Sequence, residues 1–113
     1  MQDAPFTLFE PVHRSSCVVF ATPHSGRHYA PEFLAQSVLD SHAIRASEDA
    51  FVDHLFEPAV QFGAPLLVAN APRAYVDLNR ACDELDPAVI DSVKSSGVNA
   101  GIASGHGVVP RVV

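Results

Sequence analysis

The sequence predicts an α/β protein in which helices pack on a β-sheet. Two short apolar runs, residues 17–22 and 65–70, contain β-branched residues and end at turn-forming residues, which is typical of buried strands. Residues 31–39 and 47–63, which lie between these runs, carry apolar side chains at helical spacing. An extended segment over residues 73–78 completes the predicted order of strand, helix, helix, strand and strand.

The first predicted strand ends at a loop that carries a histidine. Residues 23–26, with the sequence Pro-His-Ser-Gly, follow residues 17–22 directly. Ligand sites of open α/β sheets form beyond the carboxyl ends of strands, and histidine binds metals or acts as a general base, so His24 is a candidate functional residue. The alternative is a loop histidine that forms only local hydrogen bonds. Cys17, which begins the strand, is expected to be a small buried hydrophobe.

Both predicted helices have recognisable ends. Pro31 suits the first turn of a helix, where its missing N–H costs nothing. Ser47 is a candidate N-cap of the second helix, Pro58 is expected to kink or shorten this helix, and Gly63 is a candidate end. These residues place the two helices between the two buried strands.

Two carboxylates, Glu48 and Asp49, stand at the predicted start of the second helix. Complementation of the helix dipole explains acidic residues at this place without any further function. The alternative is that one of them binds a divalent cation together with His24, because a catalytic zinc takes three protein ligands from His, Glu or Asp. His24 and one carboxylate would supply two of these ligands, and the sequence offers no convincing third.

The third predicted strand and the residues after it form another candidate region. In an extended chain alternate side chains share one face, while those between them face the core. The shared face would carry Arg73, Tyr75, Asp77 and Asn79. Two arginines, Arg73 and Arg80, near an aspartate and an asparagine can hold a substrate carboxylate by paired hydrogen bonds. A solvated strand face with an Arg–Asp ion pair is an equally good interpretation.

The last third of the chain is rich in turn-forming residues. A short helix is expected over residues 86–93, and four glycines follow it over residues 97–107. Residues 110–113 resemble the beginning of a strand, and a self-contained domain rarely ends on such a segment. We therefore expect residues 1–113 to be the amino-terminal part of a longer single domain.

Composition and charge exclude several classes of function. The chain has 13 acidic and 7 basic residues, and the basic residues form no cluster, so we expect neither a nucleic-acid partner nor a basic membrane-surface helix. Apolar stretches reach about five residues, whereas a membrane-spanning helix needs about 20. No signal peptide is visible, and a cytoplasmic location is expected. The sequence leaves the oligomeric state open.

Three segments taken together resemble the N-formylglutamate amidohydrolase family. These segments are Pro23-His24-Ser25-Gly26, the pair Glu48-Asp49, and the stretch from Arg73 through Asp77-Leu78-Asn79-Arg80. The resemblance covers most of residues 15–113. It implies a mixed sheet flanked by helices, similar to the zinc carboxypeptidase-like (phosphorylase/hydrolase-like) fold. It also implies a hydrolase that removes formate from N-formyl-L-glutamate, or an acyl group from a related N-acyl amino acid, in histidine degradation.

The resemblance further implies roles for individual residues. His24 would be the first ligand of a divalent metal, zinc above all, and Asp49 the carboxylate ligand, with Glu48 as the alternative. Arg73 would be catalytic, near the scissile carbonyl or a second carboxylate. The substrate-binding residues would be Ser25, Gly26, Asp77, Asn79 and Arg80, among which Asn79 and Arg80 would grip a carboxylate and Asp77 would orient an arginine. A bound metal would polarise the unreactive formyl amide and lower the pKa of its water toward about 7.

The chain also departs from the family pattern. The family chain is more than twice as long, and its second half carries a further histidine motif and the expected general base. We therefore expect this chain by itself to bind metal weakly and to turn over little substrate. The alternative functions are a non-catalytic module that binds an acidic amino acid and an inactive remnant. Metal dependence separates them, because carboxylate binding would survive a chelator.

Overall fold

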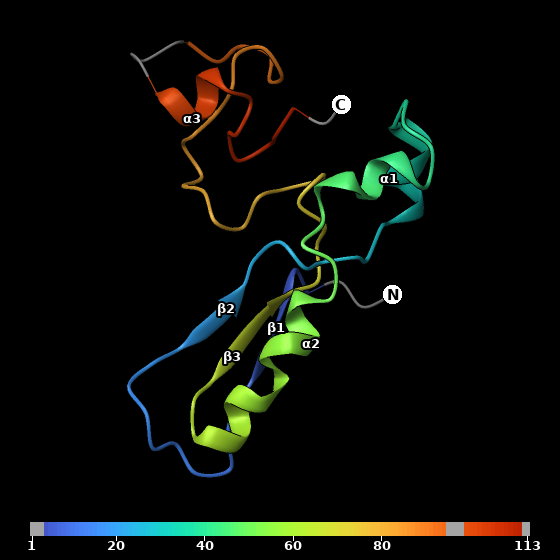
Figure 1. Ribbon diagram of the computed structural model, residues 1–113. Helices are drawn as coiled ribbons and strands as arrows, with labels where there is room; N and C mark the ends of the chain where they lie inside the picture. The colour runs from blue at the N-terminus through green and yellow to red at the C-terminus, as the bar shows by residue number, and fades with distance from the viewer. Residues whose placement is uncertain (1–3, 95–98, 112–113) are drawn as a thin grey trace.

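The computed structural model describes residues 4–94 and 99–111 and contains a three-stranded mixed sheet with helices (Figure 1). The strand order is β1-β3-β2. The central strand β3, Leu66–Ala69, pairs antiparallel with β1, Phe6–Phe9, and parallel with β2, Phe20–Thr22. The predicted α/β class is confirmed, and the sheet is mixed.

The helices of the protein are short. The α-helices are α1, Pro31–Gln36, α2, Val52–Phe56, and α3, Ala100–Ala103, and the 3-10 helices are η1, Ala43–Ser47, and η2, Glu57–Phe62. Figure 1 shows α2 and η2 alongside the sheet and α3 in a separate region at the other end of the chain. Among the described residues, no helix combines the length and the apolar character needed to cross a membrane.

The core of the protein centres on β3. Leu66 is 1% exposed, and Val68 and Ala69 are also buried. One face of the sheet is covered by α2 and η2, and the ring centroids of Phe20 and Phe56 lie 5.5 Å apart there. Outer-strand side chains pack less completely, since Phe6 on β1 is half exposed. The sheet thus holds β2 and its carboxyl end firmly against β3.

The two predicted helices are shorter in the structure than in the sequence analysis. The first ends at Gln36, because Ser37 has an extended backbone. The second begins at Val52 rather than Ser47, because Phe51 adopts the left-handed conformation, with φ 64°, before it. Glu48 and Asp49 therefore precede the helix, and the prediction that they lie in its first turn is wrong.

The expected end of the second helix is confirmed. The α-helix gives way to the 3-10 helix η2 at Glu57, immediately before Pro58. Gly63 then ends η2 in the left-handed conformation, with φ 77°, which favours glycine. The strand over residues 65–70 is likewise confirmed as β3.

The predicted strand over residues 73–78 is wrong. The N–H groups of Tyr75 and Val76 both donate to the carbonyl of Pro72, so the chain turns there instead of extending. Asp77 is buried and Leu78 is exposed, the reverse of the prediction at these two positions, whereas Ala74 is buried and Tyr75 is exposed as expected. Polar side chains of this segment still lie beside the sheet, but a turn places them there instead of an extended strand.

Three other predictions also differ from the structure. Cys17 is exposed, because the strand begins only at Phe20. Residues 86–93 form turns rather than a helix, and strand β1 was not predicted at all. The segment 110–113 forms no strand at 110 and 111, and its last two residues lie outside the described residues.

Candidate metal and substrate site

The loop that carries His24 is fixed to the end of the sheet. Ser25 is buried, and its hydroxyl donates to the carbonyl of Thr22 at 3.1 Å and contacts the Thr22 hydroxyl at 2.9 Å. Gly26 lies so close to the backbone just after β3 that a Cβ atom on it would clash with the carbonyl group of Ala71. These contacts give Ser25 and Gly26 a structural role, and their substrate-binding role stays a prediction.

Asp77 forms a hydrogen bond with one nitrogen of the His24 ring, Nε2. The Asp77 Oδ1 atom lies 2.7 Å from His24 Nε2 and accepts the N–H of Asn79 at 2.9 Å. Burial opposes the ionisation of this carboxyl, but the hydrogen bonds from Asn79 and His24 outweigh it and hold the pKa of Asp77 below its usual range. Asp77 therefore orients His24, whereas the sequence analysis expected it to orient an arginine.

The opposite ring nitrogen, His24 Nδ1, faces Asp49 and Arg73. The Asp49 Oδ2 atom lies 3.5 Å from Nδ1, and the Asp49 N–H donates to the carbonyl of His24 at 2.9 Å. Arg73 Nη2 makes a close hydrogen-bond contact with Nδ1. Because a guanidinium only donates and a carboxylate only accepts, the neutral form of His24 consistent with these contacts has its proton on Nε2, and the lone pair of Nδ1 accepts from Arg73.

Glu48 is turned away from His24. Its carboxylate accepts the Tyr29 hydroxyl at 2.6 Å and pairs with Arg45 at 3.1 Å, and its side chain is 3% exposed. Burial and the bond to Glu48 raise the pKa of Tyr29 well above its usual range. The geometry thus favours Asp49 over Glu48 as the carboxylate beside His24.

Arg73 brings a positive charge to the same point. Its Nη2 atom lies 3.9 Å from Asp49 Oδ2 in addition to its contact with His24. Its Nε atom is buried, and within the described part of the chain it has no hydrogen-bond partner. The guanidinium therefore marks a position that the surrounding acceptors favour for a cation.

The spacing of the side chains around His24 suits a metal ion. Tetrahedral zinc with His and carboxylate ligands places two ligand atoms about 3.4 Å apart. The observed separation of His24 Nδ1 and Asp49 Oδ2 is 3.5 Å, and the Asp77 carboxylate behind the ring is the usual support of a ligating histidine. In residues 4–94 and 99–111 no group of three metal-binding side chains is found. His24 and Asp49 thus fit as two ligands of such an ion.

Asn79 and Arg80 lie next to this group. The Asn79 side chain is exposed, whereas Arg80 donates to the carbonyls of His106 at 3.0 Å and Asn79 at 2.9 Å. Arg80 also lies close enough to lower the pKa of Asp77 through its charge. Part of the Arg80 guanidinium is thus committed to the main chain, and its grip on a substrate carboxylate stays a prediction.

The structure brings together four of the predicted site residues: His24, Asp49, Arg73 and Asp77. The sequence analysis missed the direct pairing of Asp77 with His24, which are 53 residues apart. No local signal could have revealed it, because it depends on the turn after Pro72. His24, 12% exposed, thus lies between two carboxylates at the carboxyl end of a strand, the place where ligand sites of open α/β sheets form.

The comparisons with known proteins identify the family. The family model described as N-formylglutamate amidohydrolase matches residues 16–113, and the chain belongs to this family. The chain is also similar to the crystal structure of N-formylglutamate amidohydrolase from Ralstonia eutropha JMP134, with 34% identity and a TM-score of 0.81. That match covers 95% of this chain and 38% of the solved chain, so this chain spans well under half of that relative. No curated protein matches the sequence significantly.

Proposed function

We propose that the protein contributes the His24 side of a metal-dependent amidohydrolase site that releases formate from N-formyl-L-glutamate or a related N-acyl amino acid. The observation that carries the proposal is the pair of contacts on the His24 ring. Asp77 fixes Nε2 at 2.7 Å, and Nδ1 faces Asp49 Oδ2 at 3.5 Å. Membership of the family supports the reaction, and degradation of histidine is the proposed setting.

The ligands proposed for the metal are His24 Nδ1 and Asp49 Oδ2, and zinc suits this pair of donors. When bound, a divalent ion supplies a polarised carbonyl and an acidic water for amide hydrolysis. Asp77 stays ionised at neutral pH and keeps the proton of neutral His24 on Nε2, away from the ligating nitrogen. In this tautomer Nδ1 carries no proton, and a metal that binds there would take the place of the Arg73 hydrogen bond.

Arg73 is proposed to change partners when a substrate arrives. Its Nη2 atom contacts His24 and approaches Asp49, so it already stands at the point where the amide would react. A guanidinium there can stabilise negative charge that develops on the carbonyl oxygen. Arg80 and Asn79 are proposed to bind a carboxylate of the substrate, because a substrate with two carboxylates needs positive charge in an otherwise acidic protein.

The proposal is tested by binding and hydrolysis together. Binding of N-formyl-L-glutamate is measured by calorimetry with Zn²⁺ and with a chelator, and formate release is measured in parallel. We expect binding to weaken after chelation and in His24→Ala, and any release of formate to stop in both. Binding that survives both changes would contradict the proposal and favour a non-catalytic module for acidic amino acids.

A further inference from the structure

A second cluster, formed by Arg27 and Asp53, lies beside the site and links the segments that carry His24 and Asp49. Arg27, three residues after His24, makes two hydrogen bonds to Asp53, with Nη1 3.2 Å from Oδ1 and Nη2 3.1 Å from Oδ2. Asp53 lies in the first turn of α2, four residues after Asp49. This bidentate pair therefore ties the loop that carries His24 to the segment that carries Asp49.

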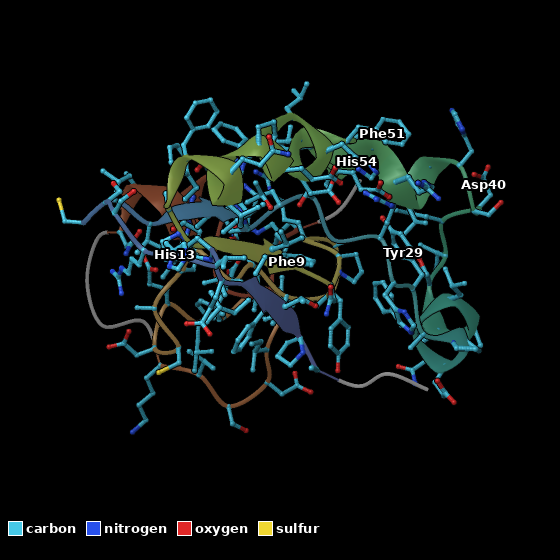
Figure 2. All side chains as sticks on the ribbon, turned by 90° about the horizontal axis from the view of Figure 1, so that it is seen from below. Phe9, His13, Tyr29, Asp40, Phe51 and His54 are labelled. Carbon is cyan, nitrogen blue, oxygen red and sulfur yellow. The ribbon has the colours of Figure 1, made fainter. Side chains whose placement is uncertain are left out.

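The same arginine covers a residue with unusual backbone geometry. Phe51 has φ 64°, a left-handed conformation that residues other than glycine rarely adopt, and such strain persists only where neighbouring contacts hold it. The guanidinium of Arg27 lies 5.6 Å from the centre of the Phe51 ring. The His54 ring stacks on the Phe51 ring, with the two ring centres 6.1 Å apart, and Figure 2 shows these two side chains near each other. Arg27 Nη2 also lies 3.1 Å from His54 Nε2.

The left-handed residue sets the direction of Asp49. Phe51 is two residues after Asp49, and Val52 donates to the Asp49 carbonyl at 3.3 Å across this bend. The Asp49 N–H donates to the His24 carbonyl on the other side. A release of Phe51 from its bend would rotate the Asp49 segment and move its carboxylate away from His24 Nδ1.

We propose that Arg27 is a positioning residue that holds Asp49 against His24 by clamping Asp53 and Phe51. The inference rests on the proposed function, in which His24 and Asp49 are two ligands of one divalent ion. The Arg27 side chain is 34% exposed and the Asp53 side chain 14%, so water screens part of their attraction and the pair adds only modestly to folding stability. Its effect is therefore expected on the alignment of the two ligands rather than on the fold.

The test is a thermodynamic cycle of zinc binding. The dissociation constant for Zn²⁺ is measured by calorimetry for the wild type, Arg27→Met, Asp49→Ala and the double variant. Arg27→Met is expected to weaken binding about tenfold to 100-fold, the usual cost of losing a residue that supports a ligand. In the Asp49→Ala background the same change is expected to have no effect, since Arg27 acts only through Asp49. Arg111→Met, which breaks another bidentate Arg–Asp pair, is the control for lost charge and is expected to bind like the wild type.

A second measurement needs no metal. Hydrogen exchange of the Asp49 amide, observed by NMR, is expected to accelerate in Arg27→Met and to stay unchanged in Arg111→Met. In Arg27→Lys, which keeps the charge but loses the bidentate hydrogen bonds, the exchange rate of the Asp49 amide should lie between those of wild type and Arg27→Met.

Either of two results would overturn the inference. One is equal zinc affinity in Arg27→Met and wild type, and the other is an equal loss in both backgrounds, which a general structural effect would produce. If zinc binding does not depend on His24, the proposed function fails instead. Exchange of the Asp49 amide then still decides whether Arg27 holds this segment.

Discussion

Replacement of Asp77 by asparagine isolates the role of its charge. Both hydrogen bonds of Asp77 end on Oδ1, which accepts from His24 Nε2 at 2.7 Å and from Asn79 N at 2.9 Å. Asparagine offers a carbonyl oxygen in the same place, so only the charge assistance is lost, a cost of about 1 kcal/mol in the free energy of unfolding. Alanine removes both bonds, and hydrogen bonds to a charged group contribute about 1.5 to 3 kcal/mol each, so Asp77→Ala should cost about 3 kcal/mol or more.

The pH dependence of this difference has a definite sign. The pKa of Asp77 is lowered in the folded protein, so its charge stabilises the fold above the ordinary carboxyl pKa of about 3.9. This stabilisation is lost as the pH falls through the lower pKa of the folded state. Urea unfolding should therefore separate wild type from Asp77→Asn at pH 7, and the two curves should converge at strongly acidic pH.

Zinc titration of the same variant tests the orientation of His24. An asparagine favours the proton on His24 Nε2 less strongly than an aspartate does. Loss of a residue that supports a metal ligand lowers metal affinity about tenfold to 100-fold, and the zinc affinity of Asp77→Asn should fall by an amount at the lower end of this range. Asp77→Asn with unchanged zinc affinity and an unchanged urea midpoint at pH 7 would refute the assignment of Asp77 as the residue that orients His24.

Three further predictions concern the neighbours of His24. Asp49→Ala should weaken zinc binding while Glu48→Gln leaves it unchanged; the reverse pattern in calorimetry would assign the ligand to Glu48. Glu48→Gln should also lower the free energy of unfolding in urea by about 1 to 2 kcal/mol, because Glu48 accepts from Tyr29 and pairs with Arg45. Arg73→Met should bind zinc at least as tightly as wild type, since a cation is removed from beside His24 and Asp49, but should release no formate; weaker zinc binding would contradict this account. Gly26→Ala should lower the free energy of unfolding in urea by more than about 2 kcal/mol, because its Cβ would clash with the Ala71 carbonyl; a wild-type value would show that the loop does not pack there.

Local patterns in the sequence predicted the parts of the fold that local rules govern. The apolar run before Asn70 formed the central strand, and Pro58 and Gly63 ended the second helix as expected. Strand β1 was missed because its four residues are identified only by pairing with β3, which lies about 60 residues away. The start of α2 was placed too early because nothing in the sequence reveals that Phe51 takes a left-handed conformation.

The sequence predicted which residues form the candidate site better than it predicted how they are arranged. His24 and Asp49 were paired from their residue types and from the family resemblance, and the structure places them 3.5 Å apart. The alternation expected around Asp77 was wrong because a turn after Pro72 replaces the strand and buries the carboxylate behind His24. Contacts between residues so far apart depend on tertiary packing, which periodicity does not encode.

The most direct test of the central claim is a calorimetric titration of the protein and of His24→Ala with Zn²⁺. The account predicts one weak site per chain, because only two ligands are assigned, and a loss of affinity of about tenfold or more in the variant. Zinc binding of equal strength in wild type and His24→Ala would contradict the claim that His24 and Asp49 form part of a metal site.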